Sequence, residues 1–159
     1  MAISHAQPLV LLLFVSLFFL PALGKNVRFG YCSGGSLYPV TVLTVDISPQ
    51  PIIGTQSSAN ITISGFTILG ISRSAQVTAN LVVSGNVIPP LPPKTYSLCD
   101  LTDCPVNLGF IELTFTNFFT KDDLLWANGR GVFVRIEITD TADFVKDKLC
   151  MYFECETRW

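Results

Sequence analysis

Apolar and polar residues alternate along much of the chain beyond residue 36. A period of two residues is typical of strands that have one buried face. Segments that alternate in this way, or that are rich in β-branched residues, run over 37–48, 58–66, 75–83, 108–118, 131–139 and 148–156. Proline, glycine and asparagine separate these segments, and 121–127 favours a single helical turn. About seven strands at such intervals predict an all-β fold, an antiparallel β-sandwich.

The first 24 residues have a different pattern. Leu9–Leu20 is an apolar run of twelve residues, which is shorter than the roughly 20 residues that span a bilayer. Small residues follow at Ala22 and Gly24, the two positions that a signal peptidase reads. We therefore predict a signal peptide over residues 1–24, cleaved after Gly24, and one mature domain over residues 25–159. A short membrane anchor is the alternative.

Composition then narrows the chemistry. The one histidine is His5, so the mature chain contains none, which excludes a Ser-His-Asp triad, a Cys-His pair and a His-ligated metal site. The net charge of −2 disfavours nucleic acid as a partner. A hydrolase would need paired carboxylates such as Asp100/Asp103 or Asp122/Asp123, but loop aspartates commonly stabilise turns. We therefore expect no enzyme activity, no metal and no other cofactor.

The chain has five cysteines, and secretion would place them in an oxidising compartment. The pairs 99/104 and 150/155 share a spacing found in zinc sites. On a strand, however, Cys150 and Cys155 point to opposite faces and lie about 16 Å apart. We expect Cys99 to pair with Cys104 across a tight loop, and Cys32 to pair with Cys150 or Cys155. Cys150 is favoured because its face of the strand is more polar, which leaves Cys155 as a buried free thiol.

Asn60-Ile61-Thr62 is an N-glycosylation sequon. In a secreted protein it predicts a glycosylated Asn60 that faces solvent. A chance match to the sequon is the alternative.

Four stretches of the chain resemble the ML family of secreted lipid-recognition domains: 38–49, 59–65, 96–106 and 149–153. The segment Leu98-Cys-Asp-x-x-x-Cys-Pro105 is the most specific of them. The resemblance is to the plant phosphatidylglycerol/phosphatidylinositol-transfer-like branch, which is related to the Niemann-Pick type C sterol-binding protein. It implies an immunoglobulin-like antiparallel β-sandwich with a lipid cavity between the two sheets. It also implies the disulfides 32–150 and 99–104.

The function that this resemblance implies is lipid binding or lipid transfer by a secreted, monomeric protein. The ligand would be a sterol or a phospholipid, and burial of its apolar surface would supply about 25 cal/mol per Å². Delivery would involve transient membrane contact outside the cell, or alternatively in a vacuole or lysosome lumen. The alternative function is that of a secreted accessory protein that binds another protein, in immune or stress signalling.

The inner faces of the strands supply the candidate cavity residues, for which ordinary sandwich core is the alternative. They are Ile61, Ile63, Val77, Leu81, Ile111, Leu113, Phe115, Val134, Ile136, Met151 and Phe153. Apolar residues in or beside loops are candidates for a cavity mouth or membrane-touching rim, unless they fold back to cap the core. These are Val87, Ile88, Leu91, Phe118, Phe119, Leu124, Leu125 and Trp126.

Charged residues near these loops bear on the ligand. Asp122 and Asp123 oppose docking on strongly anionic membranes. Lys94, Lys121 and Arg130 either pair with a lipid headgroup or are ordinary solvated surface charges.

Overall fold

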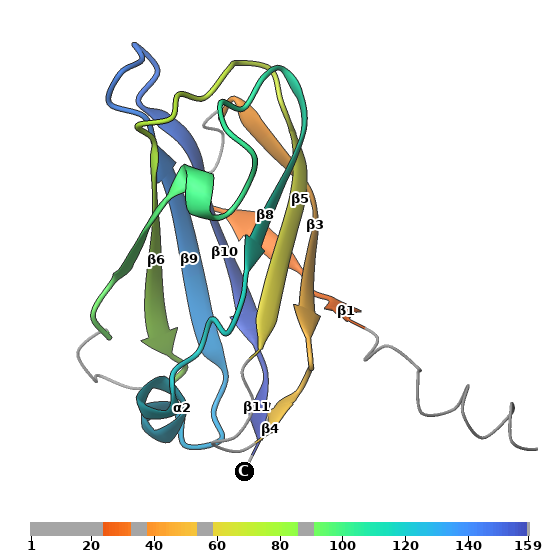
Figure 1. The fold of residues 1–159 in the computed structure, drawn as a ribbon. Coiled ribbons are helices and arrows are strands. Elements are labelled where there is room, and N and C mark those ends of the chain that lie inside the picture. The colour runs from red at the N-terminus through yellow and green to blue at the C-terminus, as the bar shows by residue number, and fades with distance from the viewer. Residues whose placement is uncertain (1–23, 33–37, 54–58, 86–90, 159) are drawn as a thin grey trace, which may run out of the picture.

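The protein was analysed as a computed structural model, which describes residues 24–32, 38–53, 59–85 and 91–158. Two antiparallel sheets pack face to face (Figure 1), which confirms the predicted all-β sandwich. One sheet has the order β1 (Lys25–Asn26), β3 (Val40–Ser48), β5 (Asn60–Thr67) and β8 (Gly109–Phe115). The other has the order β2 (Phe29–Tyr31), β10 (Asp147–Cys155), β9 (Val132–Thr139), β6 (Gln76–Val83) and β7 (Lys94–Ser97). β4 (Ile52–Ile53) and β11 (Thr157–Arg158) form a small parallel pair.

Each alternating segment of the sequence contains a strand whose ends lie within three residues of the predicted ones. The strands that the pattern did not predict are β1, β2, β4, β7 and β11. These strands have two to four residues, so they are too short to display a period of two. The predicted signal peptide lies outside the described residues except for Gly24, which is exposed.

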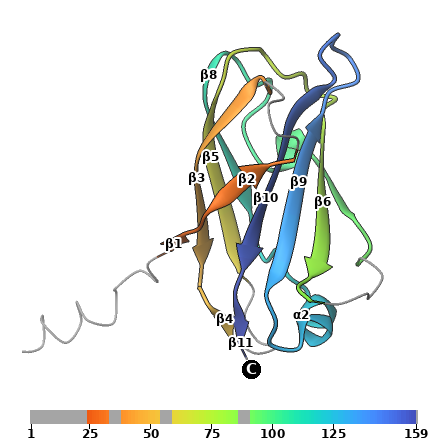
Figure 2. The same ribbon diagram turned by 180° about the vertical axis from the view of Figure 1, so that it is seen from behind.

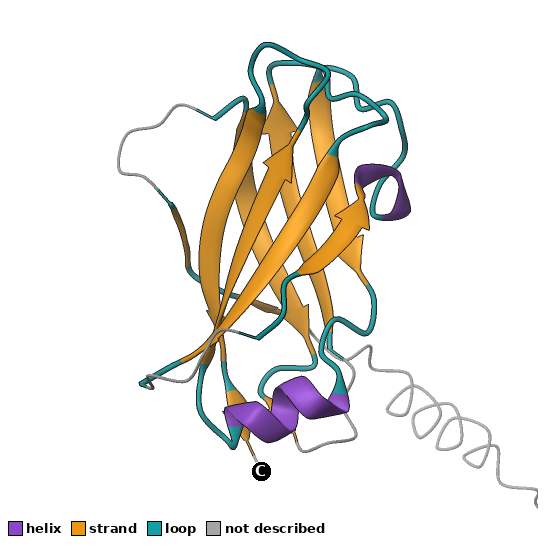
Figure 3. Ribbon diagram, turned by 90° about the vertical axis from the view of Figure 1, so that its left-hand side faces the viewer, coloured by secondary structure: helices purple, strands orange, loops and turns teal. Residues whose placement is uncertain are grey.

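The helical turn predicted for 121–127 is confirmed as helix α2 (Lys121–Ala127). Its N-terminus has a capping box, in which Thr120 and Asp123 each accept a hydrogen bond from the other's backbone N–H. Asn128 ends the helix in a left-handed conformation, with φ of 49°. A short 3-10 helix, η2, spans Leu98–Asp100. Figure 3 shows α2 across one end of the sandwich, and in the described ranges no helix has the length and apolarity needed to cross a bilayer.

Lys148 departs from the sequence prediction. The alternation places it on the outer face of its strand with Cys150, but its side chain is fully buried. The register of β10 against β9 shifts between Asp147 and Leu149, so Lys148 occupies a β-bulge. Its ammonium group forms an ion pair with Asp143 in the β9–β10 connection.

The two long sides of the sandwich are built differently. On one side, the chain passes from β1 in the first sheet to β2 in the second, where β2 pairs with β10 (Figure 2). The backbones of β3 and β10 come within 8 Å of each other there, and the disulfide Cys32–Cys150 adds a covalent link. On the other side, β7 and β8 are the edge strands of the two sheets.

Candidate functional site

The inner faces of the two sheets bring the predicted cavity residues into one apolar layer. In the first sheet, Ile61 is paired with Phe115, Ile63 with Leu113, and Gly65 with Ile111. In the second, β9 lies between β6 and β10 and joins their inward residues into rows. These rows are Val77–Ile138–Leu149, Ala79–Ile136–Met151 and Leu81–Val134–Phe153.

All eleven predicted cavity residues belong to one hydrophobic cluster, and each exposes at most 4% of its surface. Among the described residues this layer is therefore sealed from solvent, and a ligand reaches these side chains where a segment that covers them moves. Hydrophobic contact is the interaction that such a layer offers.

Helix α2 and its flanking residues cap this layer at one end. Phe118, Phe119 and Leu124, predicted at the mouth, are buried in the core cluster, and Leu91 is half-buried against it. Trp126 and Leu125 are exposed on the outer side of α2. The predicted mouth residues Val87 and Ile88 lie outside the described residues.

Four aromatic rings run from β7 toward α2. Tyr96 contacts Phe115 edge to face at 5.4 Å between ring centroids, Phe115 contacts Phe118 at 5.5 Å, and Phe118 contacts Phe119 at 5.0 Å. This chain of rings joins the edge strands of opposite sheets. Burial raises the pKa of Tyr96 above its ordinary value, and the nearby charge of Asp123 adds to the effect.

Lys94 and Asp123 form an ion pair beside these rings. Lys94 Nζ lies 2.5 Å from Asp123 Oδ2, and the two side chains are only 19% and 11% exposed. Lys94 also donates to the carbonyl oxygen of Phe118 at 2.5 Å and lies 5.1 Å from the centroid of that ring. The interpretation of Lys94 as a solvated surface charge is therefore wrong. Sequence reasoning missed this pair because its members are far apart along the chain.

The structure contains the two predicted disulfides. Cys32–Cys150 has a Cα–Cα distance of 5.4 Å and Cys99–Cys104 one of 5.3 Å. Cys155 is free and buried, as expected. Burial, together with the charge of Glu154, raises the pKa of its thiol far above the ordinary value, so the thiol stays protonated and unreactive.

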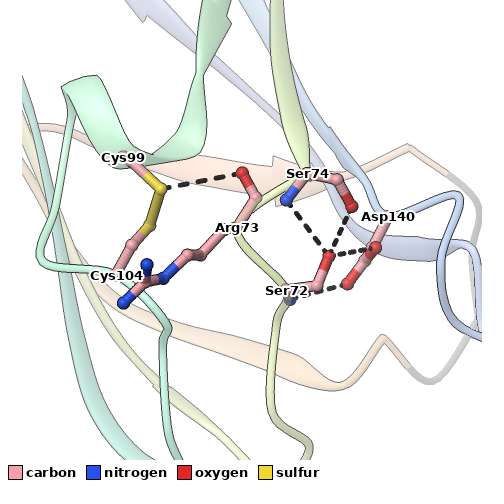
Figure 4. The surroundings of a disulfide bond; sticks show 6 residues. All are labelled: Ser72, Arg73, Ser74, Cys99, Cys104 and Asp140. Atoms are coloured by element: carbon pink, nitrogen blue, oxygen red, sulfur yellow. Dashed lines mark hydrogen bonds between the residues drawn. A yellow bond between two sulfur atoms is a disulfide. The ribbon is translucent and has the colours of Figure 1, made fainter.

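A buried carboxylate, that of Asp140, accepts several hydrogen bonds at the end of the sandwich opposite α2. Asp140 accepts hydrogen bonds from the Ser72 N–H at 2.8 Å, the Ser72 hydroxyl at 2.7 Å and the Ala142 N–H at 3.1 Å. Figure 4 shows this cluster next to the Cys99–Cys104 disulfide, whose Cys99 sulfur lies 3.7 Å from the carbonyl oxygen of Arg73.

The Asp140 carboxyl is almost fully buried. Burial opposes its ionisation, but the bonds from Ser72 and Ala142 and the charge of Lys148 outweigh that effect and lower its pKa. These bonds lie within the protein, and we assign the cluster a structural role. Among the described residues, no group of three or more His, Cys, Asp or Glu side chains is placed to hold a metal ion.

The surface of the described residues includes hollows of about 270 to 350 Å³. They are lined by mixed polar and apolar residues, and Ile111 is the one predicted cavity residue among their lining residues. Asn60, the sequon asparagine, is exposed at the start of β5, and its Oδ1 accepts a hydrogen bond from Asn117 N–H at 3.0 Å.

A family model of the ML domain matches residues 26–149. The chain belongs to the ML domain family. The ML domain match begins in β1 and ends within β10, so it takes in strands of both sheets. The chain is 43% identical over 153 residues to MD-2-related lipid-recognition protein ROSY1 of Arabidopsis thaliana. The alignment covers 96% of this chain and 90% of that protein. The chain is 39% identical over 132 residues to MD-2-related lipid-recognition protein 3 of the same plant. That alignment covers 79% of this chain and 74% of that protein.

Proposed function

We propose that this ML domain protein is a secreted lipid carrier that holds a sterol or phospholipid between its two β-sheets. The observation that carries the proposal is the sealed apolar layer built from both sheets. The names of the two plant relatives, which describe lipid recognition, support the same class of ligand.

In this proposal the tail of the lipid inserts between the inward rows of β5 and β8 and those of β6, β9 and β10. Each methylene group transferred from water to such a layer contributes about 0.8 kcal/mol. Binding of this kind needs no catalytic group. The Cys32–Cys150 and Cys99–Cys104 disulfides support a secreted location, because such bonds persist in oxidising compartments.

Membrane contact during loading would use the end of the sandwich at α2. Leu125 and Trp126 are exposed there, and tryptophan is favoured at the boundary between lipid and water. The pairing of Asp123 with Lys94 removes one of the two negative charges that weighed against this contact.

The accessory-protein function has its own supporting observation. Phe66 and Phe110 are directly paired and exposed on the outer face of the first sheet, and Leu43 and Leu108 are exposed nearby. Exposed apolar residues that gather in this way are typical of protein interaction surfaces. The two functions are compatible, because the inner and outer faces of the sheet are separate surfaces.

The test is uptake of lipid by protein secreted from a eukaryotic host. The protein is incubated with vesicles that contain either a fluorescent sterol or a fluorescent phosphatidylglycerol, re-isolated and analysed by native mass spectrometry. We expect a complex of one protein with one lipid for at least one of them. Protein that remains without lipid after both incubations contradicts the proposed function.

A further inference from the structure

The side of the sandwich formed by β7 is held by few backbone bonds. β7 has four residues and pairs with β6 alone, from Gln76↔Ser97 to Ala79↔Lys94. Pro92 and Pro93 before it have no N–H with which to extend the ladder, and the backbone bonds just outside the ladder run from the Leu91 N–H to the Leu81 carbonyl oxygen at 3.3 Å and from the Leu98 N–H to the Ala75 carbonyl oxygen at 3.0 Å. Side-chain contacts therefore supply much of what holds this edge in place.

Lys94 lies on the inner side of this edge. Residues that are paired directly across two strands share a face of the sheet, so Lys94 and Tyr96 face inward with their partners Ala79 and Val77. Lys94 bonds to two groups that follow β8 in the chain, the Phe118 carbonyl oxygen and the Asp123 carboxylate. The Phe118 N–H in turn donates to the Ala59 carbonyl oxygen beside β5. The ion pair thus connects the edge of the second sheet to the α2 cap and, through it, to the first sheet.

The two partners depend on the pair unequally. The Asp123 carboxylate also accepts the Thr120 N–H, and the Asp123 N–H donates to Thr120, so Asp123 remains bonded if Lys94 leaves. If Asp123 moves away, the Lys94 ammonium group keeps only the bond to the Phe118 carbonyl oxygen among the bonds described, beside the buried ring of Phe118. Release of the pair therefore loosens the contact of β7 with the α2 cap without unwinding α2.

From this geometry we infer that the Lys94–Asp123 pair is a latch that holds β7 against the α2 cap, and that its release is the step that admits a lipid to the apolar layer. The inference rests on the proposed function. When the latch opens, the edge-to-face contact between Tyr96 and Phe115 separates and the layer behind Phe115 becomes accessible. Lys94 is in this account a positioning residue that governs the rate of entry and not the capacity of the layer.

The experiment measures the rate of uptake of a fluorescent sterol and of fluorescent phosphatidylglycerol from vesicles. Lys94→Met keeps the length of the side chain and its packing on Phe118 while removing the charge. Asp123→Asn keeps an oxygen that can accept the Thr120 N–H. A hydrogen bond to a charged group contributes enough that its loss should raise the rate about tenfold, with the amount of lipid bound at saturation unchanged. Lys94→Arg, which retains the charge, should remain close to wild type.

Ser72→Ala is the matched control, because it removes a bond to Asp140 at the opposite end of the sandwich. It should lower the melting temperature without raising the uptake rate. A purely structural role for Lys94 would instead give a lower melting temperature and an unchanged rate. Hydrogen exchange of the Tyr96 amide, which is paired with Val77 of β6, should also be faster in Lys94→Met, while exchange in β9 stays the same.

The outcomes separate the inference from the proposed function. If wild-type protein takes up neither lipid, the proposed function fails and the latch fails with it. If wild type takes up lipid and both Lys94→Met and Asp123→Asn do so at the wild-type rate, the latch alone is wrong. If the variants do not fold, wild-type hydrogen exchange decides: exchange in β7 that increases when vesicles are present, while exchange in β9 does not, supports the latch, and exchange in β7 that vesicles leave unchanged overturns it.

Discussion

Tyr96 of β7 and Phe115 of β8 meet edge to face, with 5.4 Å between their ring centroids, and so join the free edges of the two sheets. The position of Tyr96 at this contact raises the pKa of its hydroxyl, because burial and the charge of Asp123 both oppose ionisation. The alkaline stability of the fold therefore reports on this edge.

Tyr96→Phe should make the protein less sensitive to alkaline pH. The pKa of Tyr96 is raised in the folded state above its ordinary value of 10.0. The folded state thus holds the proton more tightly, and the stability that this provides is complete below pH 10.0 and is lost as the pH rises through the folded pKa. Urea unfolding above and below this value should show a smaller loss for Tyr96→Phe than for wild type. Equal losses in the two proteins would contradict the raised pKa of Tyr96 in the folded state.

Ser72→Ala should destabilise the fold by about 2 kcal/mol at neutral pH, because it removes a hydroxyl that donates to the buried Asp140 carboxylate. The folded pKa of Asp140 is lowered, so this stabilisation is present above the ordinary carboxyl value of 3.8 and is lost as the pH falls through the folded pKa. Urea unfolding at several pH values should find that the difference from wild type shrinks in strong acid. A difference that is constant with pH would mean that the hydroxyl does not act through the carboxylate.

Ala79→Phe should reduce the amount of lipid bound at saturation. Ala79 is fully buried in the middle inward row of the second sheet, so a phenyl ring there occupies space within the layer. The overpacking should also lower stability by about 1–3 kcal/mol. Val82→Phe on the exposed face of the same strand is the matched control and should bind as wild type does. Equal binding by both variants would place the ligand outside the layer.

The two disulfides should contribute unequally to stability. Cys32–Cys150 closes a span of 118 residues and Cys99–Cys104 one of 5. The chain-entropy relation gives about 5 kcal/mol for the first and about 2 kcal/mol for the second. Guanidinium unfolding of the double serine variants Cys32→Ser/Cys150→Ser and Cys99→Ser/Cys104→Ser measures both. The reverse order would show that local structure at the 99–104 loop dominates.

Asn60 should carry one glycan when the protein is made in a eukaryotic secretory pathway, because the residue is exposed at the start of β5. Asn60→Gln and Thr62→Ala both destroy the sequon, but only the first alters the bond from the Asn117 N–H. Each variant should be lighter than glycosylated wild type by the mass of the glycan, which is the mass that wild type loses on treatment with an N-glycosidase. A wild-type mass that the glycosidase leaves unchanged would show that the sequon is unused.

The parts of the fold that the sequence predicts are those with a repeated local signal. Inward residues such as Ile136 and Met151 recur every second position, and this period is enough to place them on a buried face. Lys148 follows the same period but is buried, because a bulge at the start of β10 interrupts the alternation. Single-sequence patterns do not reveal such a bulge, nor the ion pair that Lys148 forms with Asp143 in the preceding loop.

Lys94 and Phe118 illustrate a second reason why the sequence does not predict every buried side chain. A lysine after two prolines has the local pattern of a solvated residue, and only the pairing of β7 with β6 directs it inward to Asp123. Phe118 and Phe119 follow the end of a strand, where alternation no longer applies, so the sequence left open whether they form a mouth or a cap. Long-range packing decides both cases.

The fastening of one long side by β1, β2 and the Cys32–Cys150 bond has a mechanical consequence. Two sheets joined in this way cannot translate apart, so any separation is a rotation about an axis near β10. Displacement in a rotation grows with distance from the axis, and β7 is the strand farthest from β10 in its sheet. A turn of a few degrees that barely disturbs Met151 would therefore move Tyr96 the most.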